Sequence, residues 1–199
     1  MRTLDIGCGA VRDPSADAGM DFYPYQGVDI VHDATRFPWP IRDEAFDRLV
    51  SHQLVEHLPA RDAVAGRDIF FEFFDEAWRI LKPGGTFAFD TPHKDNPLAY
   101  GDVTHRRFWQ EFAFSHLWDP ARDPLYPRRI WELVSINITR WYGVGWFNTY
   151  HVRRYLPRLD RFLCRHRIGS ARMIFIVLRK PPSPQTRGTA EPTGTATAR

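Results

Sequence analysis

The stretch Leu4-Asp5-Ile6-Gly7-Cys8-Gly9 decides the fold class. Its first three residues end a short segment, Arg2 to Ile6, that is typical of a β-strand. This segment leads directly into Gly7 and Gly9, two glycines of a tight turn. Downstream, short strand-like apolar segments alternate with stretches of helical period. We therefore predict an α/β fold of three layers, with a mostly parallel sheet covered on both faces.

The elements after this first strand are predicted from the same periodicities. Further strands are expected over residues 19–22, 28–31, 46–51, 86–90, 131–139 and 172–179. An amphipathic helix is expected over residues 67–81 and ends at Lys82-Pro83-Gly84-Gly85, and a short helix is expected over 110–117. Only ten residues, Ala10 to Gly19, separate the first two strands, so we expect a loop with at most two helical turns there.

Composition limits the class of protein. Among 199 residues, 43% are hydrophobic and 26% are charged, which fits one globular domain over residues 1–180. Residues 181–199 are rich in Pro, Thr, Ala and Gly without apolar period, and we expect a disordered tail. No apolar run reaches the roughly 18–20 residues of a membrane span, and the N-terminus lacks the apolar stretch of a signal peptide. The expected location is cytoplasmic, and Cys8 and Cys164 form neither a disulfide framework nor a zinc motif.

Charge is distributed unevenly along the chain. Residues 1–126 carry 13 Lys and Arg against 21 Asp and Glu, whereas residues 127–180 carry 12 against 2. Aromatic residues and arginines interleave over residues 140–167. This pattern suits nucleic-acid bases, an anionic membrane surface or a dimer contact, and equally suits charge complementarity with the acidic half. The sequence leaves these alternatives and the oligomeric state open.

The two glycines do not complete a dinucleotide-binding motif. Arg12 occupies the position of the third glycine in the pattern G-x-G-x-x-G, and the following segment is too short for a helix aimed at a pyrophosphate. A nicotinamide dinucleotide is therefore disfavoured.

Several motifs in their order along the chain resemble class I S-adenosylmethionine-dependent methyltransferases. These motifs are Leu4-Asp5-Ile6-Gly7-Cys8-Gly9, the strand ending at Asp21, the pair Asp33-Ala34, Phe46-Asp47-Arg48-Leu49-Val50-Ser51 with Leu54-Val55-Glu56-His57-Leu58, and Ile80-Leu81-Lys82-Pro83-Gly84-Gly85-Thr86-Phe87. The resemblance is close over residues 2–92. Beyond them, Gly101-Asp102-Val103-Thr104-His105 resembles a subgroup of small methyltransferases whose substrates are uncharacterised. The resemblance to the family implies a Rossmann-like seven-stranded sheet with the last strand antiparallel, and S-adenosylmethionine as cofactor.

The resemblance also implies roles for matching residues. The loop Gly7-Cys8-Gly9 would carry the methionine end of the cofactor. Asp5 would orient this loop or bind the amino group of the cofactor through water. Cys8 would be a small packing residue within the loop. Asp21 would accept both ribose hydroxyls. Asp33 and the Ala34 backbone would bind the adenine edge, and Ser51-His52 would flank the methionine and the methyl group.

Residues 91–126 are expected to cover the site and to contact the substrate. Within them His93 and His105 are the candidate general bases, each with an alternative structural role. His93, Asp102 and His105 also offer two imidazoles and a carboxylate, but we expect no metal.

These inferences favour an enzyme that transfers a methyl group from S-adenosylmethionine to an oxygen or nitrogen of an unidentified small-molecule or polyanionic acceptor, with S-adenosylhomocysteine as product. The alternative is a non-catalytic cofactor-binding scaffold that engages a partner through residues 140–167. The sequence does not identify the acceptor.

Overall fold

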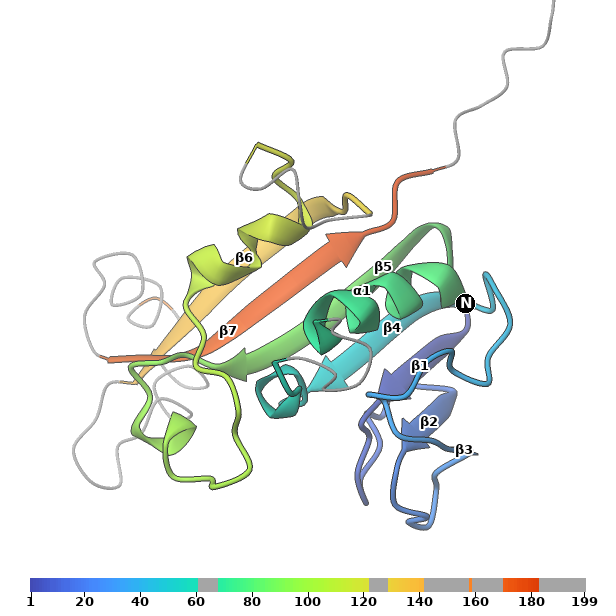
Figure 1. The fold of residues 1–199 in the computed structure, drawn as a ribbon, viewed down its shortest axis with the longest axis horizontal. Helices are drawn as coiled ribbons and strands as arrows, with labels where there is room; N and C mark the ends of the chain where they lie inside the picture. The colour runs from blue at the N-terminus through green and yellow to red at the C-terminus, as the bar shows by residue number, and fades with distance from the viewer. Residues whose placement is uncertain (61–67, 122–128, 142–157, 159–169, 183–199) are drawn as a thin grey trace, which may run out of the picture.

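The computed structural model describes residues 1–60, 68–121, 129–141, 158 and 170–182 (Figure 1). Most of the basic region 140–167, the end of the predicted cover at 122–126 and nearly all of the predicted tail 181–199 lie outside these residues. No helix in the described part of the chain is long and apolar enough to cross a membrane.

Seven strands form one sheet in the order β3-β2-β1-β4-β5-β7-β6. The strands are β1 (Thr3–Ile6), β2 (Ala18–Asp21), β3 (Ile30–Val31), β4 (Phe46–His52), β5 (Leu81–Pro92), β6 (Glu132–Trp141) and β7 (Ser170–Arg179). Strands β1 to β5 pair in parallel, whereas β7 is antiparallel to both β5 and β6. The predicted α/β fold, with a mostly parallel sheet and an antiparallel last strand, is therefore confirmed.

The helix α1 (Ile69–Ile80) packs its apolar side on one face of the sheet (Figure 1). It begins where the carboxylate of Asp68 accepts a hydrogen bond from the Phe70 N–H at 2.9 Å, as an N-cap does. Its Phe73 and Phe74 meet Phe87 of β5 at ring-centroid distances of 6.1 and 5.7 Å. Burial of such large aromatic side chains contributes about 1.5–3 kcal/mol each, so this face holds the centre of the core.

The chain turns from α1 into β5 more sharply than predicted. The predicted helix over 67–81 is confirmed, but Lys82-Pro83-Gly84-Gly85 lies inside β5 instead of forming a separate stop. Gly84 has φ +79°, and a Cβ on Gly85 would lie 2.8 Å from the Asp47 carbonyl oxygen. Only glycines fit this irregularity, where the register between β4 and β5 shifts.

Two connections determine the shape of the site. No helix joins β1 to β2 in the structure, in agreement with the expected loop. After β5, the segment continues through the 3₁₀ helices η2 (Pro97–Ala99) and η3 (Glu111–Leu117), and the second of these is the short helix predicted at 110–117. Phe114 of η3 is fully buried and packs on Phe89 at 5.4 Å, which anchors this segment to the sheet.

Candidate functional site

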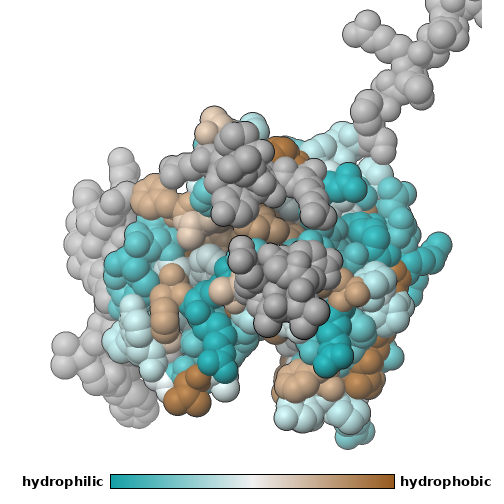
Figure 2. Space-filling model, in the orientation of Figure 1, coloured by the Kyte–Doolittle hydropathy of each residue, from teal (hydrophilic) through white to brown (hydrophobic). Residues whose placement is uncertain are grey.

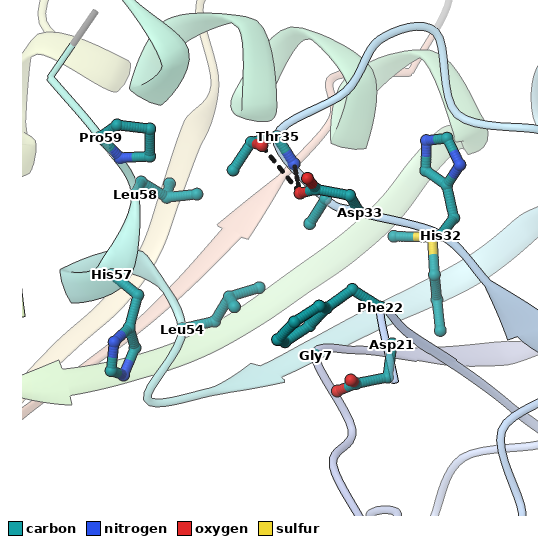
Figure 3. Close-up of a pocket in the computed structure, with 12 residues that line it drawn as sticks. Gly7, Asp21, Phe22, His32, Asp33, Thr35, Leu54, His57, Leu58 and Pro59 are labelled. Carbon is teal, nitrogen blue, oxygen red and sulfur yellow. Dashed lines mark hydrogen bonds between the residues drawn. The ribbon is translucent and has the colours of Figure 1, made fainter. Parts of the chain in front are cut away.

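A cavity of about 340 Å³ lies at the carboxyl ends of the first strands. Its lining residues are Gly7, Met20, Asp21, Phe22, His32, Asp33, Ala34, Thr35, Leu54, His57, Leu58 and Pro59 (Figure 3). Strand order reverses between β1 and β4, and in open α/β sheets ligands bind beside such a reversal. The space-filling view shows a notch at the lower edge of the molecule (Figure 2).

The glycine turn after β1 forms one wall of the cavity. Gly7 has φ +73°, a left-handed conformation that strains other residues, and a Cβ there would lie 3.0 Å from the Leu54 side chain. The N–H groups of Gly7 and Cys8 both donate to the Met20 carbonyl oxygen, at 2.8 and 3.2 Å. These bonds hold the turn against β2.

Asp21 ends β2 and joins the turn to the cavity. One carboxylate oxygen accepts the Gly9 N–H at 2.8 Å, and the other accepts the Tyr23 N–H at 2.9 Å. The residue is 7% exposed and lines the cavity. Because each carboxylate oxygen has two lone pairs, both retain an acceptor position for a ligand hydroxyl.

Asp33 and Ala34 follow β3 on the opposite wall. The Asp33 carboxylate accepts the Thr35 N–H at 2.9 Å and the Thr35 hydroxyl at 2.7 Å (Figure 3). Burial opposes ionisation of Asp33, but these bonds and Arg36 outweigh it and hold its pKa below the usual range. Asp33 therefore presents a charged carboxylate.

Apolar side chains complete the cavity. Phe22 and Leu54 point toward one another from two walls, with the carboxylates of Asp21 and Asp33 to either side (Figure 3). Phe22 is 61% exposed and lines the cavity. Sequence reasoning missed Phe22, His32 and Leu54. Phe22 is the last residue of a predicted strand, and His32 and Leu54 follow closely on the ends of two others.

Asp5, Ser51 and His52 lie near the turn but not among the lining residues. The Ser51 hydroxyl donates to the Ile6 carbonyl oxygen at 2.9 Å and so joins β4 to β1. Asp5 accepts the Asp13 N–H at 2.8 Å with one oxygen, while its other oxygen is buried without a partner. Burial raises the pKa of Asp5.

The His52 ring is held between two carboxylates. Its Nδ1 lies 2.5 Å from Asp90 and its Nε2 lies 3.0 Å from Asp13. Burial opposes the charged ring, but the bonds to Asp90 and Asp13 outweigh it and raise the pKa of His52. His52 thus connects β4, β5 and the loop after the glycine turn.

Cys8 is buried against Gly19, where an added Cβ would lie 2.7 Å from the Cys8 sulfur. Burial and the nearby charges of Asp5 and Asp21 raise the pKa of the thiol to about 11. It stays protonated near neutral pH, which suits a packing residue and not a nucleophile.

The structure separates His93 from the cavity lining. His93 is 5% exposed; its Nδ1 accepts the Asp95 N–H at 3.0 Å, and its Nε2 lies 3.3 Å from a Glu111 carboxylate oxygen. Both ring nitrogens are thus engaged within the segment after β5.

His105 is also outside the lining, but it contacts a residue within it. Its Nδ1 donates to the Ala99 carbonyl oxygen at 2.7 Å, and its ring meets the His57 ring edge-on at 4.7 Å. His57 lines the cavity. Of the grouping of His93, Asp102 and His105 considered from the sequence, Asp102 lies 3.9 Å from His105 Nε2, but the residues that join His105 in a cluster are Glu56 and His57 instead of His93.

Part of the chain is similar to a known protein family. Residues 4–89 match the family described as "Methyltransferase domain". The matched residues run from β1 into β5 and include Gly7, Asp21, Asp33 and Ala34 of the cavity. No curated protein matches the sequence.

Solved structures share the fold of this chain at low sequence identity. A SAM-dependent methyltransferase from Archaeoglobus fulgidus has 15% identity and a TM-score of 0.54, covering 90% of this chain and 86% of its own. One from Thermotoga maritima has 15% identity and a TM-score of 0.52, covering 90% and 82%. The N-methyltransferase NodS from Bradyrhizobium japonicum WM9, in complex with S-adenosylhomocysteine, has 14% identity and a TM-score of 0.50, covering 90% and 78%.

Proposed function

We propose that this protein transfers the methyl group of S-adenosylmethionine to an oxygen or nitrogen of an acceptor, releasing S-adenosylhomocysteine. The observation that carries the proposal is the cavity at the carboxyl ends of β1, β2 and β3, where a glycine turn and two carboxylates meet. Its volume of about 340 Å³ falls within the range of small-molecule sites. The match to the methyltransferase domain family supports the same cofactor.

The lining residues suit the parts of that cofactor. Asp21 offers acceptor positions to the two ribose hydroxyls, and Asp33 with the Ala34 N–H offers an acceptor and a donor to the adenine edge. Phe22 and Leu54 provide apolar surfaces for the faces of the adenine ring. The similar fold of NodS was solved with S-adenosylhomocysteine, which agrees with this assignment.

The methionine end would lie at the Gly7-Cys8-Gly9 turn. The buried Asp5 oxygen without a partner lies behind this turn and suits the cofactor ammonium group, reached through a water molecule. Ser51 and His52 would then support the strand end and the loop beside the methionine without lining the cavity.

The transfer itself asks for little chemistry from side chains. A lone pair of the acceptor forms the new bond to the methyl carbon, the carbon–sulfur bond breaks, and sulfur keeps its electron pair. The acceptor proton leaves to a base or to solvent. Most of the acceleration would come from holding the acceptor about 3 Å from the methyl carbon, in line with sulfur and away from water. His93 and His105 are the candidate general bases for this proton.

The test separates the enzyme from a cofactor-binding scaffold. Calorimetry with S-adenosylhomocysteine should show one site per chain. The chain should then move tritium from methyl-labelled S-adenosylmethionine into an acceptor of a protein-free cell extract, with equimolar S-adenosylhomocysteine formed. Binding without any transfer would favour the scaffold, and absence of binding would refute the proposed cofactor.

A further inference from the structure

Glu56, His57 and His105 form a cluster from which the proposed methyl transfer uses only His105, as a candidate base. One potential ligand atom from each lies within 4.8 Å of those of the other two. Glu56 and His57 belong to the 3₁₀ helix η1 (Val55–His57), directly after β4, whereas His105 comes from the segment after β5. The fold therefore brings together residues that are 48 or more positions apart.

Glu56 contributes one free carboxylate oxygen. The residue is only 1% exposed. Its Oε2 accepts the Thr91 hydroxyl at 3.0 Å, whereas its Oε1 is buried without a hydrogen-bond partner. An ionised carboxylate in such a place costs several kcal/mol unless a cation compensates it, and burial raises the pKa of Glu56 to about 7.

His57 has its free lone pair on Nε2. The single hydroxyl proton of Thr104 is donated to Asp102 at 2.6 Å. The contact between Thr104 Oγ1 and His57 Nδ1, at 3.0 Å, then requires Nδ1 to be the donor. The neutral ring consequently carries its lone pair on Nε2. Burial and the neighbouring His105 lower the pKa of His57, which keeps this neutral form.

His105 shows the same arrangement. Its Nδ1 donates to the Ala99 carbonyl oxygen, which is able only to accept, so the neutral ring also carries its lone pair on Nε2. Metal-binding histidines usually donate their second ring N–H to a carboxylate, a backbone carbonyl or a water molecule. His105 has such a partner in the Ala99 carbonyl oxygen. His57 donates to the Thr104 hydroxyl, which in turn donates to Asp102, and the other oxygen of that carboxylate lies 3.9 Å from His105 Nε2.

We propose that Glu56, His57 and His105 bind one divalent transition-metal ion of the Zn²⁺ or Co²⁺ type. Two imidazoles favour such ions, whereas Mg²⁺ and Ca²⁺ prefer sites made of oxygen ligands. This inference replaces the expectation from the sequence that no metal binds.

Three protein ligands leave positions open for other donors. Because His57 also lines the cavity, an oxygen of a methyl acceptor would fill one of them. This last step rests on the proposed function, whereas metal binding itself does not.

The experiment titrates Co²⁺ into the metal-free full chain without an affinity tag, followed by visible absorption. One equivalent should bind with a spectrum of mixed nitrogen and oxygen ligands, Zn²⁺ should displace it, and Zn²⁺ should raise the melting temperature.

Variants at the ligands should weaken binding selectively. Glu56→Gln keeps the volume and an acceptor for Thr91 but loses the charged ligand, so Co²⁺ affinity should fall at least about tenfold. Its metal-free melting temperature should be unchanged or higher, because a buried charge is removed. His105→Gln should weaken Co²⁺ binding similarly. The matched control is His32→Gln, which removes another cavity-lining histidine outside the cluster and should leave Co²⁺ affinity unchanged.

Failure to bind Co²⁺ or Zn²⁺ in the folded parent chain would overturn the proposal, as would undiminished binding in both Glu56→Gln and His105→Gln. The affinity for S-adenosylhomocysteine, measured on the same metal-free protein, reports separately on the proposed function.

Discussion

The carboxylate of Asp21 accepts the Gly9 N–H at 2.8 Å, which ties the end of β2 to the glycine turn after β1. A single side chain thus fixes two walls of the cavity. The bond also fixes the orientation of the carboxylate before any ligand arrives, so little ordering entropy remains to be lost on binding. Asp21 is for this reason the most informative position at which to test the cofactor site.

Asp21→Asn should lower the affinity for S-adenosylhomocysteine by about 10- to 100-fold. The amide keeps the size of the side chain but replaces charge-assisted bonds to the ribose, each worth about 1.5–3 kcal/mol, with weaker neutral ones. Calorimetry measures the change. Asp43→Asn is the control, because Asp43 is exposed and pairs with Arg79 away from the cavity. Parent affinity in Asp21→Asn would remove Asp21 from the site.

Phe22→Ala should reduce the same affinity by about five- to tenfold, since an aromatic contact contributes about 0.5–1.5 kcal/mol beyond area burial. Its effect on the free energy of unfolding should be small, because the side chain is 61% exposed. Phe112 is equally exposed but lies outside the cavity lining, so Phe112→Ala should leave the affinity unchanged. Equal affinities in the two variants would argue against Phe22 contacting the cofactor.

Sequence patterns predicted the sheet well because its signals are local. Strand-like segments such as Leu4 to Ile6 end at a glycine, and the helix over 67–81 shows a clear period. The sequence predicts that Gly84-Gly85 separates α1 from β5, because two glycines and a proline indicate a break. It does not show that β5 already begins at Leu81 and pairs with β4 again from Thr86.

The site was predicted in part for the same reason. Four predicted residues lie at strand ends or within three residues after them, and all four line the cavity: Gly7, Asp21, Asp33 and Ala34. The cluster of Glu56 with His105 depends on how the segment after β5 returns to the sheet, and no local pattern encodes that return. One available signal was the Glu56-His57 pair set between apolar residues in Leu54-Val55-Glu56-His57-Leu58.

Lys180→Met should lower the free energy of unfolding by about 2–3 kcal/mol, as measured by urea denaturation. The Lys180 ammonium group donates to the carbonyl oxygens of Trp78 and Leu81 at 3.1 and 2.7 Å, and the residue is 8% exposed. Methionine fills the space but leaves these carbonyls without their charged donor. Lys82→Met, which breaks only the half-exposed pair with Asp47, should cost less than about 1 kcal/mol. Similar losses in both variants would contradict this interpretation.

The pair of His52 and Asp13 should give the free energy of unfolding a maximum in its dependence on pH. The raised pKa of His52 means that its contribution is complete below the unfolded value of about 6.5 and is lost as pH rises through the folded value. The pKa of Asp13 is lowered to about 2, chiefly by Ser15 and then His52, so its contribution holds above the unfolded value near 4 and is lost as pH falls toward 2. Stability should therefore be greatest between about pH 4 and 6.5.

His52→Gln should flatten the decline of unfolding free energy between about pH 6 and 8. The side chain is half-exposed, so the expected difference is below about 1 kcal/mol. His32→Gln is the control, because the His32 ring bonds the Arg36 carbonyl oxygen instead of two carboxylates and should leave the slope unchanged. An unaltered slope in His52→Gln would show that other groups cause the dependence.

His93 presents two roles that one pair of variants separates. Its Nδ1 accepts the Asp95 N–H, so the neutral ring carries its proton on Nε2, toward Glu111. To act as a general base, the ring would have to give up one of these contacts. We therefore expect His93 to support the turn at the end of β5. His93→Asn retains an acceptor near the position of Nδ1 but has no group that titrates near neutral pH, whereas His93→Ala retains neither.

With an acceptor in hand, His93→Asn should keep the melting temperature and most of the turnover, while His93→Ala should lower the melting temperature and weaken acceptor binding. The affinity for S-adenosylhomocysteine should stay constant in both variants, because His93 does not line the cavity. A general base predicts another pattern: both variants lose about 10²–10⁴ in turnover, and the pH–rate profile of the parent shows a basic group that the variants lack. Turnover against pH for the parent and the two variants decides between these roles, since restoration of activity by asparagine is compatible only with support of the turn.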